Sequence, residues 1–86
     1  MKKVTIKVDG MTGESDRRAA NEALNGLSGV VAAGDGADFD EIDAYAGERL
    51  ANKVMTDAVK SAGFPAYVIG EDYVYSPDNM FENNFF

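Results

Sequence analysis

Cysteine and histidine are both absent from this chain of 86 residues. Their absence excludes disulfide bonds, thiolate nucleophiles and imidazole bases. Of the side chains that soft or borderline metal ions prefer, only methionine is left. The chain can therefore build neither a thiolate metal centre nor a histidine-based catalytic site.

Basic residues are also few. Eight Lys and Arg residues stand against fifteen Asp and Glu residues, which gives a net charge of −7 at pH 7. A field of that sign repels phosphate backbones and anionic lipid headgroups. Nucleic acids and membrane surfaces are therefore not expected as partners.

Long apolar runs are missing as well. No stretch is long enough to span a bilayer. The N-terminus, Met1-Lys2-Lys3, passes directly into alternating polar and apolar residues, without the apolar block of a signal peptide. These features favour a cytoplasmic protein. A chain of this length forms one core, and its 45% of hydrophobic residues is enough to fold it.

The first half of the sequence predicts a strand, a helix and two further strands. Alternating apolar residues predict a half-buried strand over residues 3–9. Helical spacing predicts an amphipathic helix over 15–27, which glycines in left-handed and turn conformations end at 25–29. A second strand can begin at Val30, weakened by two glycines. Residues 41–46 alternate again and predict a third strand.

The second half predicts one more helix and one more strand. Apolar residues recur every three or four positions over 48–62 and predict an amphipathic helix that Gly63 ends. These apolar residues are Leu50, Val54, Met55, Ala58, Val59 and Ala62. A short strand follows at 66–69. The resulting order predicts an α+β fold, a ferredoxin-like βαββαβ sandwich in which two helices cover one face of a four-stranded antiparallel sheet.

Residues 71–86 differ in character from what precedes them. They contain four acids, no base and five of the nine aromatic residues, and Ser76-Pro77-Asp78-Asn79 is a turn signal after a possible strand at 72–75. We therefore predict a domain over 1–70 and an acidic, aromatic extension over 71–86. The aromatic residues of the extension are candidate anchors for a protein partner. They are Tyr73, Tyr75, Phe81, Phe85 and Phe86.

The first thirty residues resemble the opening of heavy-metal-associated domains, the family of copper chaperones, mercury-binding proteins and N-terminal modules of copper-transporting ATPases. That family has the loop pattern Gly-Met-Thr-Cys-x-x-Cys between its first strand and first helix. The matching stretch here is Gly10-Met11-Thr12-Gly13-Glu14-Ser15-Asp16. The likeness resumes at 54–68, where Lys-Ser-Ala-Gly-Phe-Pro-Ala-Tyr-Val is similar to the end of the family's second helix and its last strand. The resemblance implies the same βαββαβ fold, with Met11 packed beneath the loop and Phe64 packed near it.

Both cysteine positions of the family's loop are changed here, to Gly13 and Asp16. The family holds Cu(I) or Hg(II) between two thiolates because soft ions prefer soft ligands. Gly13 offers no side chain and Asp16 is a hard oxygen donor, so transfer of a soft metal is not expected. The simplest role for Asp16 is to complement the helix dipole or cap free amides. The alternative is a weak hard-cation site formed by Glu14, Asp16 and loop carbonyls. A metal-binding protein with altered selectivity would use Met11, Glu14 and Asp16 together.

The densest acidic cluster lies in the middle of the chain. It consists of Asp35, Asp38, Asp40, Glu41 and Asp43. Its spacing does not fit the calcium-loop template, and no nucleophile or nucleotide loop accompanies it. The cluster is therefore interpreted as a solvated turn, and we expect neither an enzyme nor a bound cofactor.

These observations favour a cysteine-less domain of the heavy-metal-associated type that acts as a protein-interaction module without soft-metal transfer. One alternative is a metal-binding protein or metallochaperone with altered, hard-cation selectivity. Another is an engineered variant whose metal ligands were removed. A protein partner is expected under the first hypothesis, through the aromatic residues of the extension.

Overall fold

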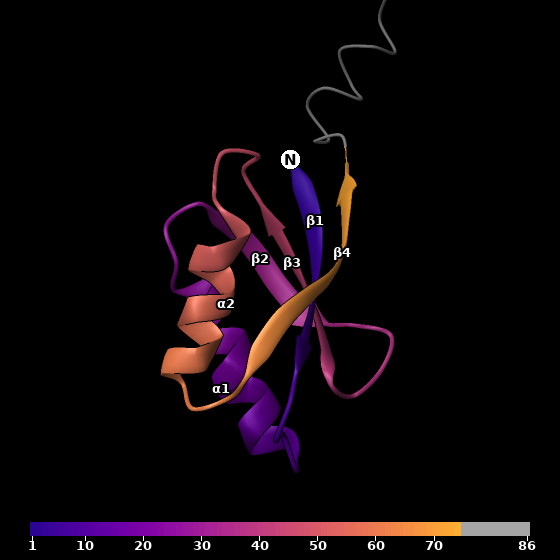
Figure 1. Cartoon of the computed structure of the whole chain (residues 1–86), viewed down its shortest axis with the longest axis vertical. Coiled ribbons are helices and arrows are strands. Elements are labelled where there is room, and N and C mark those ends of the chain that lie inside the picture. Colours follow the sequence, from indigo (N-terminus) through magenta and orange to yellow (C-terminus); the bar gives the residue numbers. More distant parts are fainter. Residues whose placement is uncertain (75–86) are drawn as a thin grey trace, which may run out of the picture.

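A computed structural model describes residues 1–74 of the chain. The strands are β1 (Lys2–Val8), β2 (Val30–Asp35), β3 (Glu41–Ala46) and β4 (Ala66–Tyr73), and the helices are α1 (Glu14–Asn25) and α2 (Asn52–Ser61). The strands form one antiparallel sheet in the order β2-β3-β1-β4. Both helices lie on the same side of this sheet (Figure 1). The predicted α+β, ferredoxin-like fold is confirmed.

The hydrophobic core lies between the sheet and the two helices. Strands β1 and β3 alternate strictly between buried and half-buried residues, and the pairs Val4–Ala44 and Ile6–Ile42 face each other across the ladder. Burial of this alternating face drives the strands and helices together. The core residues are Val4, Ile6, Val8, Ala20, Leu24, Ile42, Ala44, Ala46, Met55, Val59 and Ala66.

Helix α2 begins at Asn52, four residues later than predicted. Residues 47–50 form a turn instead, in which the Leu50 N–H donates to the Gly47 carbonyl over 3.1 Å. Leu50 then packs against the core and against Gly29, whose positive φ of 97° suits glycine. The predicted left-handed residue after α1 is thus Gly29, whereas Gly26, which ends the helix, is right-handed with a φ of −80°.

The buried face of α2 also differs from the predicted stripe. Val54, which helical spacing placed in that stripe, is 42% exposed, whereas Thr56 is only 8% exposed. The two residues lie on nearly opposite sides of the helix because each residue turns it by about 100°. Thr56 tolerates burial because its Oγ1 donates to the Lys53 carbonyl over 3.1 Å.

Strand β4 is longer than predicted. The expected short strand at 66–69 and the first two residues of the one at 72–75 belong to a single strand that runs from Ala66 to Tyr73. Its pairing to β1 is irregular near Gly70. The predicted domain boundary at residue 70 therefore falls inside this strand. Tyr75, Phe81, Phe85 and Phe86 lie outside the described residues, and the division of the chain at residue 70 stays a prediction.

Within the described part of the chain, the helices are too short and too polar to cross a membrane.

The same substitution at two positions of α2 tests this packing. Val59 is fully buried and Val54 is partly exposed. We expect Val59→Ala to lower the free energy of unfolding by about 2 kcal/mol, because it removes two buried methyl groups and leaves a cavity. Val54→Ala should change it by less than about 0.5 kcal/mol. Urea unfolding followed by circular dichroism measures both. Equal effects would contradict the observed orientation of α2.

Candidate functional site

The loop between β1 and α1 is held from below by two apolar side chains. Gly10 ends β1 with a positive φ of 87°, and a Cβ at this position would lie 4.0 Å from the Phe64 ring. Met11 is half-buried and, like Phe64, packs against the core. The packing of Met11 and Phe64 against the core is the one that the resemblance implied, and it holds the loop from the side of the core.

Asp16 closes the loop through its own hydrogen bonds. Its Oδ2 accepts from both the Thr12 N–H and the Thr12 hydroxyl, each over 3.0 Å. Gly13, at the N-cap position, makes no side-chain cap. Asp16 thus reaches back past the N-cap residue Gly13 to Thr12, and it lies at the positive end of the helix dipole. The predicted place of Asp16 in the first turn of α1 is present, but the amide that it bonds is that of Thr12, which precedes the helix.

The proposed ligands Met11, Glu14 and Asp16 have different environments. Glu14 is exposed, Met11 is packed against the core, and one oxygen of Asp16 already accepts two hydrogen bonds. A cation at this loop would have to compete with Thr12 for that oxygen. The three-residue site therefore stays a prediction.

Gly13 stands where the family has its first cysteine, and the surrounding space does not require a glycine. Its φ of −166° is extended and open to any residue. A Cβ built at this position meets nothing within 4 Å. The backbone therefore leaves room for a side chain on the solvent side of the loop.

The five acids of the predicted cluster separate into three groups. The carboxylate oxygens of Asp38, Asp40 and Glu41 lie within 4.8 Å of one another at the turn between β2 and β3. Asp35 turns instead toward α1, where its Oδ1 lies 3.0 Å from the Arg17 Nε. Asp43 accepts a hydrogen bond of 3.0 Å from the Thr5 hydroxyl.

Opposing electrostatic effects act on the carboxylates of this turn. The Lys7 ammonium, 2.9 Å from Asp40, donates a hydrogen bond that lowers the pKa of that carboxyl. Glu41 shares a hydrogen bond with the Asp38 carboxyl, which raises the pKa of Glu41. The Lys7 ammonium thus favours the charged form of Asp40, whereas the neighbouring Asp38 carboxyl disfavours the charged form of Glu41.

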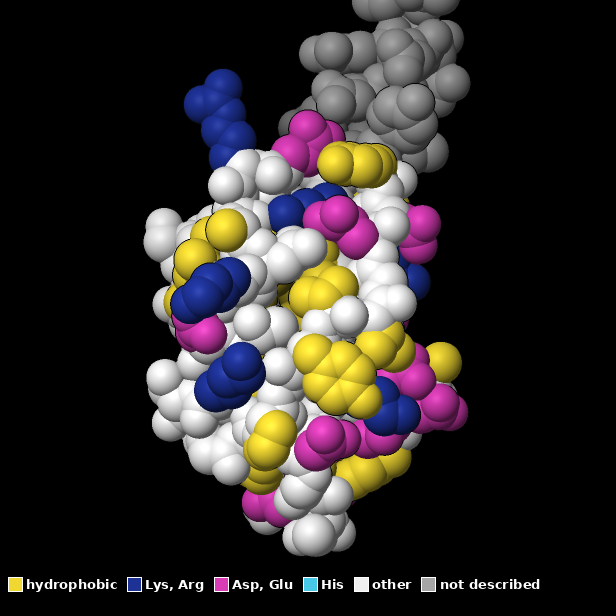
Figure 2. All heavy atoms as spheres, viewed as in Figure 1, with side chains coloured by type: hydrophobic (Ala, Val, Ile, Leu, Met, Phe, Trp, Pro, Cys, Tyr) yellow, Lys and Arg dark blue, Asp and Glu magenta, His cyan; other side chains and the backbone are white. Residues whose placement is uncertain are grey.

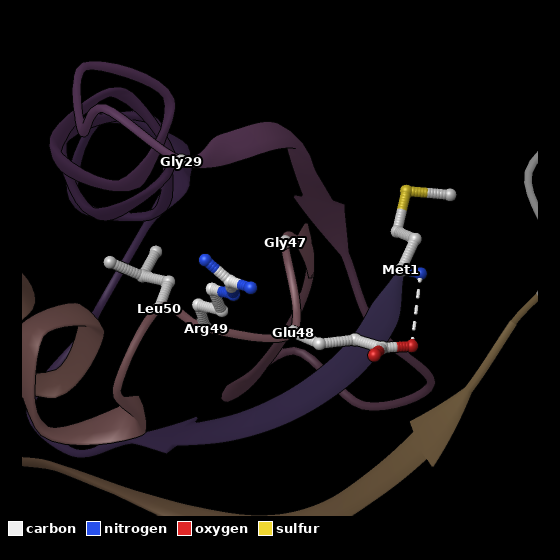
Figure 3. A pocket seen from close by; sticks show the side chains of 6 residues that line it. All are labelled: Met1, Gly29, Gly47, Glu48, Arg49 and Leu50. Atoms are coloured by element: carbon white, nitrogen blue, oxygen red, sulfur yellow. Dashed lines mark hydrogen bonds and ion pairs between the residues drawn. The ribbon is translucent and has the colours of Figure 1, made fainter.

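An open pocket of about 650 Å³ lies at the end of the sheet opposite the first loop (Figure 3). Its lining comes from the start of β1 and from the loops before β2 and after β3. The Met1 ammonium lies 3.4 Å from the Glu48 carboxylate, and Leu50 lies toward Gly29. Three separate segments form the pocket, so no local sequence motif could have predicted it. The lining residues are Met1, Gly29, Gly47, Glu48, Arg49 and Leu50.

Comparison of the sequence with known proteins gives no assignment. No protein-family model matches the chain. No curated protein matches it either.

Comparison of the structure does find similar folds. A copper-binding domain from HMA7, a P-type ATPase, aligns with a TM-score of 0.79 at 23% identity, over 85% of this chain and all of that domain. The yeast copper transporter domain Ccc2a, studied in apo and Cu(I)-loaded states, aligns with a TM-score of 0.73 at 18% identity, over 81% of this chain and 97% of its own. The CopZ metallochaperone aligns with a TM-score of 0.68 at 24% identity, over 78% of this chain and 98% of its own. The chain has the fold of heavy-metal-associated copper-binding domains, without their cysteines.

Two carboxylates in the first turn of α1 test the closure of the loop. Asp16 and Glu14 both lie near the helix N-terminus, but only Asp16 bonds Thr12. We expect Asp16→Ala to lower the free energy of unfolding by about 1 kcal/mol, as loss of a helix cap does. Glu14→Ala should cost only about 0.3 kcal/mol through the helix dipole. Denaturant titration measures both, and equal losses would show that the bonds to Thr12 contribute nothing.

The acidic turn predicts opposite pH dependences for two substitutions. The pKa of Glu41 is raised in the folded state, so ionisation of Glu41 lowers the stability of the fold as the pH rises through that pKa. Glu41→Gln removes this charge and should raise Tm near pH 7. The pKa of Asp40 is lowered, so its stabilising contribution is present above the ordinary pKa of 3.8 and is lost on acidification. Asp40→Asn should therefore lower Tm near pH 7. Both differences should shrink toward about pH 2.5, because acidification protonates the carboxyls. Calorimetry at the two pH values checks the signs, and Tm shifts of the same sign would contradict this arrangement.

Proposed function

We propose that this chain is a protein-interaction module that keeps the fold of copper-binding domains but does not transfer soft metals. The observation that carries the proposal is the self-closed first loop. Gly13 offers no ligand, and the Asp16 carboxylate is engaged by Thr12. The proposal also includes a non-enzymatic role and a cytoplasmic location.

The chemistry of the loop supports the loss of soft-metal transfer. Cu(I) is passed between proteins by exchange among soft ligands, chiefly thiolates. The chain has no cysteine, and Met11 is a single thioether that packs inward against the core. One half-buried thioether and one hard carboxylate do not replace a pair of thiolates. The fold itself does not depend on a metal, because apolar burial and the Asp16–Thr12 bonds hold the loop.

Exposed apolar side chains support the interaction role. Tyr67, Ile69 and Tyr73 of β4 are 49%, 48% and 71% exposed. Tyr73 is also the first of the aromatic residues predicted as partner anchors, and Tyr75, Phe81, Phe85 and Phe86 follow it outside the described residues. Figure 2 shows hydrophobic and acidic side chains interspersed on the side of the molecule where β4 lies in Figure 1. Exposed aromatic side chains are enriched among residues that dominate binding energy at interfaces.

The absence of catalytic partners supports a non-enzymatic role. Asp38, Asp40 and Glu41 converge at a turn, but Lys7 already pairs with Asp40, and the chain has no cysteine or histidine to act beside them. A group of solvated carboxylates without a nucleophile or a positioned acid–base partner does not constitute a catalytic site.

Copper titration of the natural chain and of a variant with restored cysteines tests the proposal. We expect the wild-type chain to leave Cu(I) with a competing chelator. Gly13→Cys together with Asp16→Cys should bind one Cu(I) per chain, at least about a thousandfold more tightly, because two thiolates then lie at the helix N-terminus. The open space around Gly13 accommodates the new side chain.

Two controls complete the titration. Gly13→Cys alone provides one thiolate and should bind Cu(I) far more weakly than the double variant. Zn²⁺ and Ca²⁺ added to the wild-type chain test the hard-cation alternative through the amide shifts of residues 10–16. Stoichiometric binding of any of these metals at this loop in the wild-type chain would overturn the proposed function.

A further inference from the structure

The two edge strands of the sheet differ in whether a side chain blocks their outward main-chain groups. An edge strand exposes a row of main-chain N–H and C=O groups that can pair with another strand, and natural proteins usually block such rows. Here the edge strands are β2 and β4. A difference in blocking between them indicates which edge is available to a partner.

The edge of β2 is blocked by a side chain of α1. The Asn25 Oδ1 accepts from the Ala33 N–H over 2.8 Å, and the Asn25 Nδ2 donates to the Ala33 carbonyl over 3.2 Å. One amide side chain thus occupies both outward groups of Ala33, as a neighbouring strand would. Asn21 adds a hydrogen bond of 3.2 Å to Asp35 at the end of the same strand.

Within residues 1–74, no side chain blocks the edge of β4 in the way that Asn25 blocks β2. The Val74 N–H donates to the Met1 carbonyl, and the Pro65 carbonyl accepts from the Asp9 N–H, each over 2.8 to 2.9 Å. The main-chain N–H and C=O groups of an antiparallel strand point alternately toward and away from its neighbour. Since the pairing with β1 shifts by one residue near Gly70, four residues of β4 direct their N–H and C=O groups away from β1. They are Ala66, Val68, Glu71 and Tyr73. Among the hydrogen bonds of residues 1–74, none runs from a side chain to the main chain of β4.

The side chains along this free edge are apolar and acidic. Tyr67, Ile69 and Tyr73 are about half exposed or more, and β4 has no base. Glu71 and Asp72 lie between Ile69 and Tyr73, and the Glu71 Oε1 lies 3.4 Å from the Lys2 ammonium of β1. The whole chain carries a net charge of −7. A second copy of this chain would bring like charge to the edge, and residues 75–86 contain two acids and no base. Charge complementarity therefore favours a basic partner.

We propose that the free edge of β4 binds an extended segment of a partner protein by strand addition, and that this segment alternates apolar and basic side chains. In such a complex, the outward groups of β4 pair with the main chain of the added strand, which provides affinity. The apolar side chains of the segment cover Tyr67 and Ile69 on the open face of the sheet. Its basic side chains lie on the opposite face, where they approach Glu71, whose register partner on β1 is the buried Val4. This inference rests on the proposed interaction role and identifies the surface and the kind of partner.

Hydrogen exchange of the full chain with a model peptide tests the inference. The probe is the blocked heptapeptide Lys-Val-Lys-Val-Lys-Val-Lys at millimolar concentration. Exchange of the Val68, Glu71 and Tyr73 amides should slow at least about tenfold on binding, because these N–H groups gain partners. The Tyr67 and Asp72 amides, already bonded to β1, should change little. A heptapeptide with Glu in place of Lys should give no protection.

Variants at the two edges provide matched controls. Tyr73→Pro removes one outward N–H without removing a hydrogen bond to β1, and it should weaken peptide binding about tenfold. Tyr73→Ala keeps the N–H and therefore measures the effect of losing the aromatic ring alone. Asn25→Ala frees the Ala33 main-chain groups and should create a second protected site on β2. These substitutions lie at the surface, and circular dichroism of each variant verifies the fold.

Four results would overturn the inference. In the first two, the Lys peptide does not protect the β4 amides, or the Glu peptide protects them equally well. In the third, the Lys peptide protects Ala33 of the wild-type chain in place of β4. In the fourth, the outward β4 amides are already protected before any peptide is added. The last result would mean that the edge is already occupied, by a second copy if it depends on protein concentration and by residues 75–86 if it does not. The peptide experiment and the copper titration fail independently. A negative peptide result leaves the expected copper titration unchanged, and uptake of Cu(I) by the wild-type chain overturns the proposed function whether or not the peptide binds.

Discussion

The central position of β1 in the sheet determines where the other elements lie. β1 pairs with β3 on one side and with β4 on the other, and its alternate residues Val4, Ile6 and Val8 are fully buried. This alternation selects the face of the sheet that both helices cover. It also places the first loop at one end of the core, over Met11 and Phe64. Apolar burial thus positions the loop.

On this scaffold, one carboxylate has taken a structural role at a position where the family has a metal ligand. The Asp16 Oδ2 satisfies the Thr12 N–H and hydroxyl and lies at the positive end of α1. A thiolate pair at this place is stabilised by the same helix dipole when it binds a soft ion. The dipole therefore stabilises negative charge in both cases, but here the charge closes the loop on itself. This difference separates the fold, which is shared with copper-binding domains, from the metal chemistry, which we propose is lost.

Most of the fold could be predicted from the sequence because its strands and helices have clear periods. The strand at 41–46 was predicted with its observed bounds, since Ile42, Ala44 and Ala46 all face the core. The start of α2 could not be predicted, because Leu50 has an apolar side chain that fits the helical period but packs from the preceding turn against Gly29. The buried place of Thr56 depends on a hydrogen bond to its own helix, which spacing does not reveal.

The candidate site was less predictable. The sequence identified Asp16 as a capping residue, but its partner, Thr12, follows from the loop conformation. The blocked edge of β2 depends on an asparagine at the end of α1 meeting Ala33 eight residues later, and no local motif signals that contact. Likewise, the acidic cluster divides among Arg17, Thr5 and Lys7 only once the strands and α1 are placed. Pairing between distant residues, which periodicity does not encode, decides these features.

The most direct test of this account is the exchange rate of the Thr12 amide in protein freed of metal with a chelator. A loop closed by Asp16 keeps this N–H bonded without any ion, so the amide should exchange at least about tenfold more slowly than an unstructured peptide amide. The contradicting result would be fast exchange of the Thr12 amide in the metal-free protein that becomes slow when metal is added. The loop would then depend on a metal.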